Sequence, residues 1–192
     1  MSVLVLYSST EGQAKKVAEQ VAKHAEAAGH AVAIYNMGSD AKVPRIASFD
    51  VVIAAASVHQ GHHQDSALTF IAAQAGELDL KKSAFISVSL SAAMADGKAE
   101  AQAYVDRFLD ATGWKPHMCL LAAGAIRLSS YDYFERQVMK YIVMQKGVAR
   151  DMDVDYECTD WPELEAFVET VLDAGTKVGV QAAGRSIDKA NA

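Results

Sequence analysis

The sequence predicts a doubly wound α/β fold, in which a five-stranded parallel sheet with strand order 2-1-3-4-5 carries helices on both faces. Short apolar, β-branched runs alternate with amphipathic stretches of helical period along most of the 192 residues. Polar, glycine-containing segments fall just after the predicted strands, where sheets of this kind bind their ligands.

The elements follow one another in regular order. Strands are expected at residues 3–7, 31–35, 51–56, 84–90 and 118–125, with helices over 12–29, 68–75 and 101–109. Asp160, Pro162 and Glu163 predict the start of the last helix, as N-cap, first-turn proline and capping-box partner. Residues 126–153 form a long insertion before that helix. One domain therefore spans residues 1–174, and the Gly- and Ala-rich tail 175–192 is expected to be disordered.

Composition narrows the class of protein. The net charge of −6 gives no reason to expect a nucleic-acid partner, because binding a polyanion needs a basic face. Cys119 and Cys158 lie far apart, so we expect no disulfide, a reducing cytoplasm, and two buried strand cysteines. Trp114 and Trp161 are expected to be packing residues. The N-terminus reads as a strand and not as a signal peptide, and no apolar run reaches the roughly 18 residues of a membrane span.

The loop after the first strand is a candidate phosphate site. It consists of Ser8, Ser9, Thr10, Glu11, Gly12 and Gln13. Hydroxyls and free backbone N–H groups at a helix N-terminus suit a phosphate monoester. The loop has neither the G-x-G-x-x-G pattern nor a Walker lysine, which argues against dinucleotides and nucleoside triphosphates. A simple N-capping turn is the alternative, because Ser, Thr and Gly are common there.

Two further loops follow neighbouring strands. The loop Ser57, Val58, His59, Gln60, Gly61, His62 and His63 could stack beside a flat aromatic ligand, or be an exposed polar turn. Its three histidines also suggest a metal site, but no carboxylate or cysteine completes a ligand set, so we predict none. The loop from Ser91 to Gly97 is rich in small residues, which let backbone approach a ring closely.

The insertion contains a basic amphipathic segment, residues 131–147, that predicts a helix. It would lie on an anionic membrane surface, cover a hydrophobic ligand, or pack on the sheet edge. The residues that we expect to contact substrate or membrane are Arg127, Tyr131, Phe134, Arg136 and Lys140. Arg127 suits a carboxylate as a bidentate partner. His59 and His62 are candidate proton acceptors, because histidine as a residue type commonly takes up protons in catalysis, although either could merely be exposed.

Four stretches of the chain resemble the menaquinone-dependent protoporphyrinogen IX dehydrogenases of bacteria, a flavodoxin-like family. They are VLVLYSSTEGQAKKVA from residue 3, ASVHQGHH with SALTF after it, SAFISVSL, and the segment from Gly124 that reads GAIRLSSYDYFERQVMKYIVM and later YECTDW. The resemblance covers roughly residues 3 to 173 and implies a flavodoxin-like fold.

The resemblance also implies FMN as cofactor. Ser9, Glu11, Gly12, Gln13 and Ala14 would form its phosphate loop, with Ala14 where the family usually has a hydroxyl, so Ser8 or Thr10 would replace it or one hydrogen bond would be missing. Residues 57–62 and 89–97 would flank the isoalloxazine; in the second range these are chiefly Ser89, Leu90, Ser91, Ala92 and Gly97. Neither segment has an aromatic residue of the kind that flavodoxins often stack on their flavin, which would leave the ring face open to a large flat substrate.

The activity implied by the resemblance is dehydrogenation of protoporphyrinogen IX to protoporphyrin IX, with electrons passing through FMN to menaquinone or ubiquinone. The protein would then be cytoplasmic and peripheral to the inner membrane. The alternatives are a flavodoxin-like electron carrier, an NAD(P)H:quinone reductase, and a flavin-free binding module on the same fold. The sequence does not indicate the oligomeric state.

Overall fold

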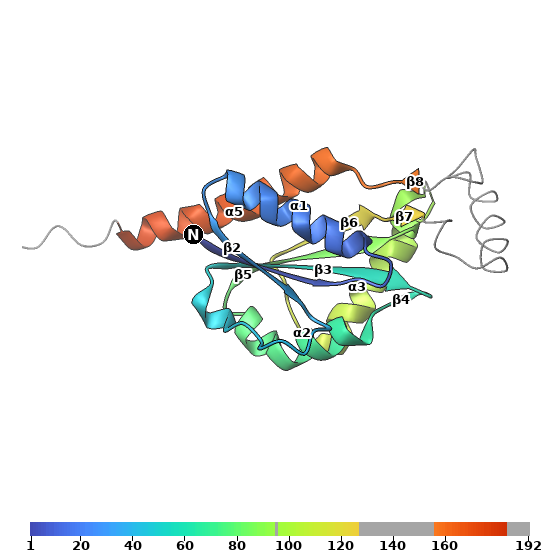
Figure 1. Ribbon diagram of the computed structural model, residues 1–192, viewed down its shortest axis with the longest axis horizontal. Helices are drawn as coiled ribbons and strands as arrows, with labels where there is room; N and C mark the ends of the chain where they lie inside the picture. The colour runs from blue at the N-terminus through green and yellow to red at the C-terminus, as the bar shows by residue number, and fades with distance from the viewer. Residues whose placement is uncertain (95, 127–155, 184–192) are drawn as a thin grey trace, which may run out of the picture.

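The computed structural model describes residues 1–94, 96–126 and 156–183 (Figure 1). Its elements, in chain order, are β1 (Ser2–Ser8), α1 (Gln13–Ala27), β2 (Ala31–Asn36), η1 (Ile46–Ser48), β3 (Val51–His59), β4 (His62–His63), α2 (Asp65–Leu78), β5 (Lys82–Ser89), η2 (Ser91–Ala93), α3 (Lys98–Thr112), β6 (Met118–Ala123), β7 (Ala125–Ile126), β8 (Tyr156–Glu157) and α5 (Trp161–Ala183).

The main sheet has the order β2-β1-β3-β5-β6, and all four of these pairings are parallel. Counted along the parallel strands alone, this is the predicted order 2-1-3-4-5, so the fold class is confirmed. The short strand β4 pairs antiparallel with the end of β3, while β7 and β8 form a separate two-stranded ribbon. The predicted helix over residues 131–147 lies outside the described residues.

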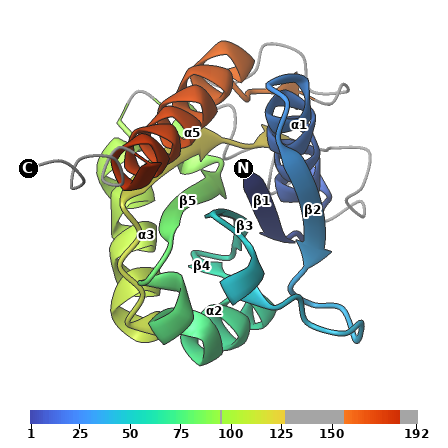
Figure 2. The ribbon, with the colours of Figure 1, turned by 90° about the vertical axis from the view of Figure 1, so that its left-hand side faces the viewer.

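Two hydrophobic layers hold the sheet (Figure 2). Helices α1 and α5 cover one face, and α1 buries its predicted stripe, including Val17, Ala18 and Val21. Helices α2 and α3 cover the other face, where Phe85 stacks on Phe108 with ring centroids 4.7 Å apart. Because both faces are covered, the central strands carry apolar side chains on both faces over most of their length.

The tryptophans pack as predicted. Trp114 is buried in the layer under α2 and α3, and its indole N–H donates to Ser83 Oγ at 3.3 Å. Trp161 is half-buried against the other core layer.

The prediction that both cysteines are buried is wrong. Cys119 is exposed and Cys158 is half-buried. Strand β6 is the last strand of the main sheet, so its side chains are covered less completely than those of central strands.

Helix α5 begins as the sequence predicts. Asp160 Oδ1 accepts a hydrogen bond from the backbone N–H of Glu163 at 3.0 Å, which is the N-cap interaction. The helix then continues past Gly175 to Ala183, beyond the point where the hydrophobic pattern fades. This last part of the helix contains two glycines, two valines and a threonine, so intrinsic helix propensity does not explain the longer element. Residues 184–192 lie outside the described part, and the domain boundary at 174 stays a prediction.

Candidate functional site

The three predicted loops lie side by side at the carboxyl edge of the sheet. In the parallel register Ser8 pairs with Ala56, and Ser57 pairs with Val88, so β1, β3 and β5 end at the same level. Helix α1 begins at this edge, and β4, β7 and β8 lie at the same end of the molecule (Figure 1). The crevice expected from the chain topology therefore has candidate residues on all sides.

The first loop leaves the N-terminus of α1 open. Gly12 occupies the N-cap position with φ 87°, a left-handed conformation that glycine adopts without steric cost, and no side chain caps the helix. Ser9 Oγ is shielded from solvent and has no hydrogen-bond partner in the described part of the chain. A buried hydroxyl without a partner costs about 1–3 kcal/mol, so an acceptor bound here would be stabilised. These features fit a phosphate and differ from the alternative of a simple side-chain-capped turn.

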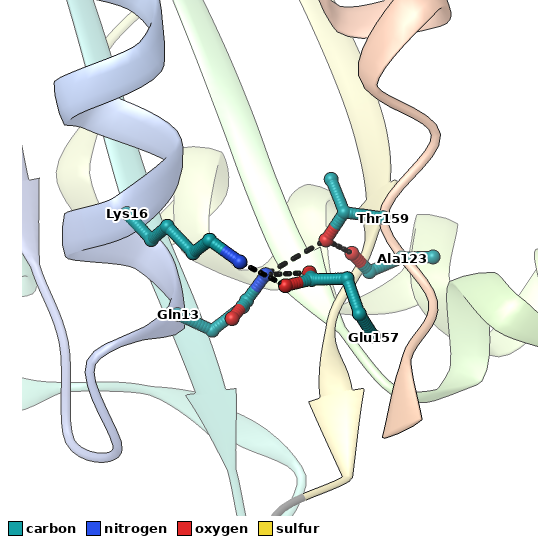
Figure 3. Close-up of polar contacts among 5 residues, drawn as sticks. All are labelled: Gln13, Lys16, Ala123, Glu157 and Thr159. Atoms are coloured by element: carbon teal, nitrogen blue, oxygen red, sulfur yellow. Dashed lines mark hydrogen bonds and ion pairs between the residues drawn. The ribbon is translucent and has the colours of Figure 1, made fainter. Parts of the chain in front are cut away.

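Gln13 and Ala14 lie within the first turn of α1 and not in the open loop. Ala14 is fully buried in the core under the helix. The side chain of Gln13 is 5% exposed and points toward residues that follow the insertion (Figure 3). Both were expected to contact the phosphate. In the structure only their backbone N–H groups, at the start of α1, remain candidates for that contact.

Four side chains, Gln13, Lys16, Glu157 and Thr159, form a polar cluster that we call the α1–β8 clamp (Figure 3). Gln13 Nε2 donates to Glu157 and, at 2.8 Å, to Thr159 Oγ1, which in turn donates to the Ala123 carbonyl at 2.7 Å. Lys16 forms a salt bridge with Glu157 and lies 5.1 Å from the centre of the Trp161 ring. The clamp thus ties helix α1 to β6, to β8 and to the start of α5.

The electrostatics of the clamp favour a charged carboxylate. Burial raises the pKa of Glu157, but hydrogen bonds from Lys16 and Thr159 together with the Lys16 charge outweigh it, so this pKa lies below its usual value. Both halves lie in stretches quoted for the resemblance, but sequence reasoning missed the cluster because the two stretches are far apart in the chain and nothing in either one indicates the contact.

The second loop is a β-hairpin, so the strand predicted to end at residue 56 extends to His59. Strand β3 runs on to His59 and pairs with β4, with His59 opposite His62 and Val58 opposite His63. Gln60 and Gly61 form the turn with φ values of 51° and 85°. Positive φ at both central residues is the type I′ pattern that matches the twist of a two-residue hairpin. The dipeptide Gln60-Gly61, a polar residue followed by glycine, is the feature of the sequence that could have indicated this turn.

The three histidines of this hairpin have different environments. His59 and His62 are exposed, and His59 Nδ1 lies 3.9 Å from Glu11 Oε1 of the first loop. His63 is 4% exposed, and its Nε2 lies 3.0 Å from Ser87 Oγ. Burial, followed by the nearby charges of Arg107 and His62, lowers the pKa of His63 from 6.5 to about 4. Among the described residues, no group of three His, Cys, Asp or Glu lies close enough to hold a metal ion.

Gln64 connects the first two loops and was not singled out in the sequence. It precedes α2, and its amide contacts Ser8, Thr10 and, at 2.8 Å, Ser57 Oγ. Ser8 also lies 2.7 Å from Ser66 Oγ. The hydroxyls of Ser8, Thr10 and Ser57, all predicted to contact the cofactor, are therefore already held in one network.

The third loop is a compact turn built on η2. Ser91 Oγ donates to Glu100 Oε2 at 2.8 Å, and Ser89 Oγ accepts from the backbone of Ala92 at 3.3 Å. A Cβ on Gly97 would lie 2.0 Å from the Ser91 carbonyl oxygen. The group that approaches Gly97 closely is therefore the backbone of Ser91, and not a ligand ring. Any side chain at position 97 would clash with it, so this turn requires glycine.

The substrate candidates of the insertion cannot be placed. Arg127, Tyr131, Phe134, Arg136 and Lys140 lie outside the described residues. The two ends of that segment are placed, because β7 and β8 pair antiparallel with Ala125 opposite Glu157. None of the described helices is long and apolar enough to cross a membrane.

Comparison with known proteins gives a family match and similar relatives. A family model described as a flavodoxin domain matches residues 4–153. The protoporphyrinogen IX dehydrogenase [quinone] of Escherichia coli K12 is 27% identical over 89% of this chain and 94% of its own length. A protein of the same name from Leishmania major is 27% identical over 85% of this chain and 71% of its own length.

Solved structures agree on the fold. A flavodoxin of Streptococcus pneumoniae TIGR4 superposes with a TM-score of 0.57 at 16% identity, covering 91% of this chain and 99% of its own. A flavodoxin from the domain Archaea gives a TM-score of 0.54 at 14% identity, covering 92% and 99%. At this level of identity the likeness concerns the fold alone.

Proposed function

The chain belongs to the flavodoxin domain family, and we propose that it is an FMN-dependent dehydrogenase of protoporphyrinogen IX that passes electrons to a membrane quinone. Family membership bears out the fold and the FMN cofactor expected from the sequence. The substrate, the quinone and a site at the cytoplasmic face of the inner membrane belong to the proposal.

One observation carries the substrate assignment. The relatives that share 27% of their residues with this chain align over 89% and 85% of it, and they bear the name of this activity. The alignments therefore reach well beyond the phosphate loop. The match does not distinguish menaquinone from ubiquinone.

The residues at the carboxyl edge fit the cofactor. The uncapped N-terminus of α1 and the partnerless Ser9 hydroxyl would hold the phosphate, whose negative charge the helix dipole favours. FMN, when bound, supplies the hydride and electron chemistry. The chain's own contribution is to bind and orient the cofactor and to leave one face of the ring accessible, because residues 57–62 and 89–97 contain no Phe, Tyr or Trp that would cover it.

Two histidines of the β3–β4 hairpin are candidate proton acceptors. His59 and His62 are exposed on adjacent strands at the same edge, where they could take up protons from a substrate lying over the hairpin. His63 is a poorer candidate, because it is buried and its pKa is about 4.

Anaerobic turnover tests the proposal. FMN-loaded protein receives protoporphyrinogen IX and a quinone, and porphyrin fluorescence is followed against reactions that lack the enzyme, FMN or the quinone. We expect fluorescence to rise only in the complete mixture. A flat trace from protein that demonstrably holds FMN would refute the substrate assignment and favour an electron carrier. Bleaching of the flavin by NAD(P)H would instead indicate a reductase.

A further inference from the structure

A cleft of about 540 Å³ lies between the β3–β4 hairpin and helix α3. Its walls come from the hairpin, from Leu68 of α2 and from one face of α3. The residues of β5 and η2 that are expected beside the flavin, Ser89 to Ala92, do not line it. The cleft is thus a separate space that shares only the hairpin with the expected cofactor site.

The lining of the cleft combines apolar, aromatic and charged side chains. Leu68 and Phe108 supply apolar surface, and His63 adds an aromatic wall that stays neutral near pH 7. Glu100 and Arg107 lie seven residues apart on α3, which corresponds to about 10 Å along the helix axis. Because Glu100 already accepts a hydrogen bond from Ser91, Arg107 is the group that selects the ligand, which must therefore carry a negative group beside an apolar body.

Arg107 is held in place before any ligand binds. Its Nη2 donates to the Gly61 carbonyl at 2.8 Å, and its guanidinium lies 5.3 Å from the centre of the Tyr104 ring. One contact uses a single donor of the five that a guanidinium carries. The group is therefore oriented at little further entropic cost, and its remaining donors match the geometry of a carboxylate.

The geometry points to this cleft as the subsite for a carboxylate-bearing pyrrole ring of the tetrapyrrole, with Arg107 binding the carboxylate and the apolar and aromatic side chains contacting the ring. The inference rests on the proposed function and adds to it the place where the substrate binds. A ring in the cleft lies against the hairpin that is expected to flank the flavin, which brings the macrocycle to the cofactor.

Direct binding tests the inference without turnover. FMN-loaded protein is titrated with protoporphyrin IX and, separately, with its uncharged dimethyl ester in the same detergent, with porphyrin fluorescence as readout. We expect Arg107→Leu to weaken binding of the diacid by roughly ten- to a hundredfold, as loss of a charge-assisted hydrogen-bonded pair would. Binding of the dimethyl ester should stay the same, and Arg107→Lys should give an intermediate affinity.

Arg45→Leu is the matched control, because it removes an exposed arginine beside η1, away from the cleft. Flavin content is measured for every variant to verify folding. Equal losses for diacid and ester, or an equal loss in Arg45→Leu, would overturn the role of Arg107. If wild-type protein binds the diacid more tightly than the ester and Arg107→Leu shows the same preference, the cleft assignment is wrong. The proposed substrate would stand in that case. Failure of wild-type protein to bind either porphyrin would refute the proposed substrate, and this subsite with it.

Discussion

The buried histidine His63 should make the stability of this protein fall as the pH drops below neutral. Its ring lies beside the stacked pair Phe85 and Phe108, with centroid distances of 5.3 and 4.8 Å, and it is 4% exposed. Burial first, then the positive charges of Arg107 and His62, lowers the pKa of His63 from 6.5 to about 4. The folded protein therefore holds this ring neutral over a pH range in which the unfolded chain would protonate it.

The sign of the effect follows from proton counting. Between pH 6.5 and about 4 the unfolded state binds more protons at this residue than the folded state does, so the free energy of unfolding increases with pH. The stabilising contribution is complete above the unfolded pKa and is lost as the pH falls toward the folded pKa. At about 1.4 kcal/mol per pH unit, the interval corresponds to a loss of about 3 kcal/mol.

The assay is denaturant unfolding at a series of pH values from 7.5 to about 4, with FMN in fixed excess. The informative variant is the double substitution His63→Phe with Ser87→Ala, which keeps an aromatic ring and removes the hydroxyl that would otherwise lose its partner 3.0 Å away. We expect this variant to lose about 3 kcal/mol less than wild type over the range. Ser87→Ala alone keeps the histidine and should follow the wild-type dependence. Parallel curves for wild type and the double variant would refute the reasoning.

Three further results are expected. Gly12→Val should reduce FMN affinity about tenfold or more, because a φ of 87° is strained by roughly 1–2 kcal/mol or more for a β-branched residue. The control Gly76→Val in α2 should leave flavin content unchanged. Equal flavin contents in the two variants would contradict the loop assignment. Thr159→Val should lower the free energy of unfolding by about 2 kcal/mol, since two hydrogen bonds are lost. Thr159→Ser should restore most of this free energy in the same denaturation assay. An unchanged free energy of unfolding in Thr159→Val would show that the hydrogen bonds of Thr159 in the clamp add nothing to stability. Replacing residues 127–155 with an Asn-Gly turn should join β7 and β8 in a two-residue hairpin. We expect this shortened protein to retain FMN but to lose porphyrinogen turnover. Retained turnover would show that the segment is dispensable for catalysis.

The layered fold was predictable because its signals are local. Each parallel strand contains a short, mostly apolar run, and each covering helix has a buried stripe, so the spacing of apolar residues distinguishes strands from helices. The N-cap at Asp160 was likewise readable from residues a few positions apart. Such patterns need no knowledge of what lies across the sheet.

The parts of the site that were missed depend on distant partners. The clamp joins Gln13 to Glu157, and Gln64 joins hydroxyls from three segments, so no window of sequence contains either arrangement. The hairpin was missed because the apolar run stops at Ala56, while the backbone pairing of β3 continues with polar side chains to His59. The exposure of Cys119 follows from strand order, which periodicity within one strand does not report.

The β7–β8 ribbon has a consequence for how such a chain can vary in length. The paired residues Ala125 and Glu157 fix both ends of the intervening segment, and the clamp anchors Glu157 to α1. Closing a loop whose ends are already fixed costs only about 0.6 kcal/mol more for each doubling of its length. The sheet and cofactor helix are therefore thermodynamically almost indifferent to how many residues lie between β7 and β8, so selection can lengthen or rewrite that segment while the flavin-binding scaffold stays the same.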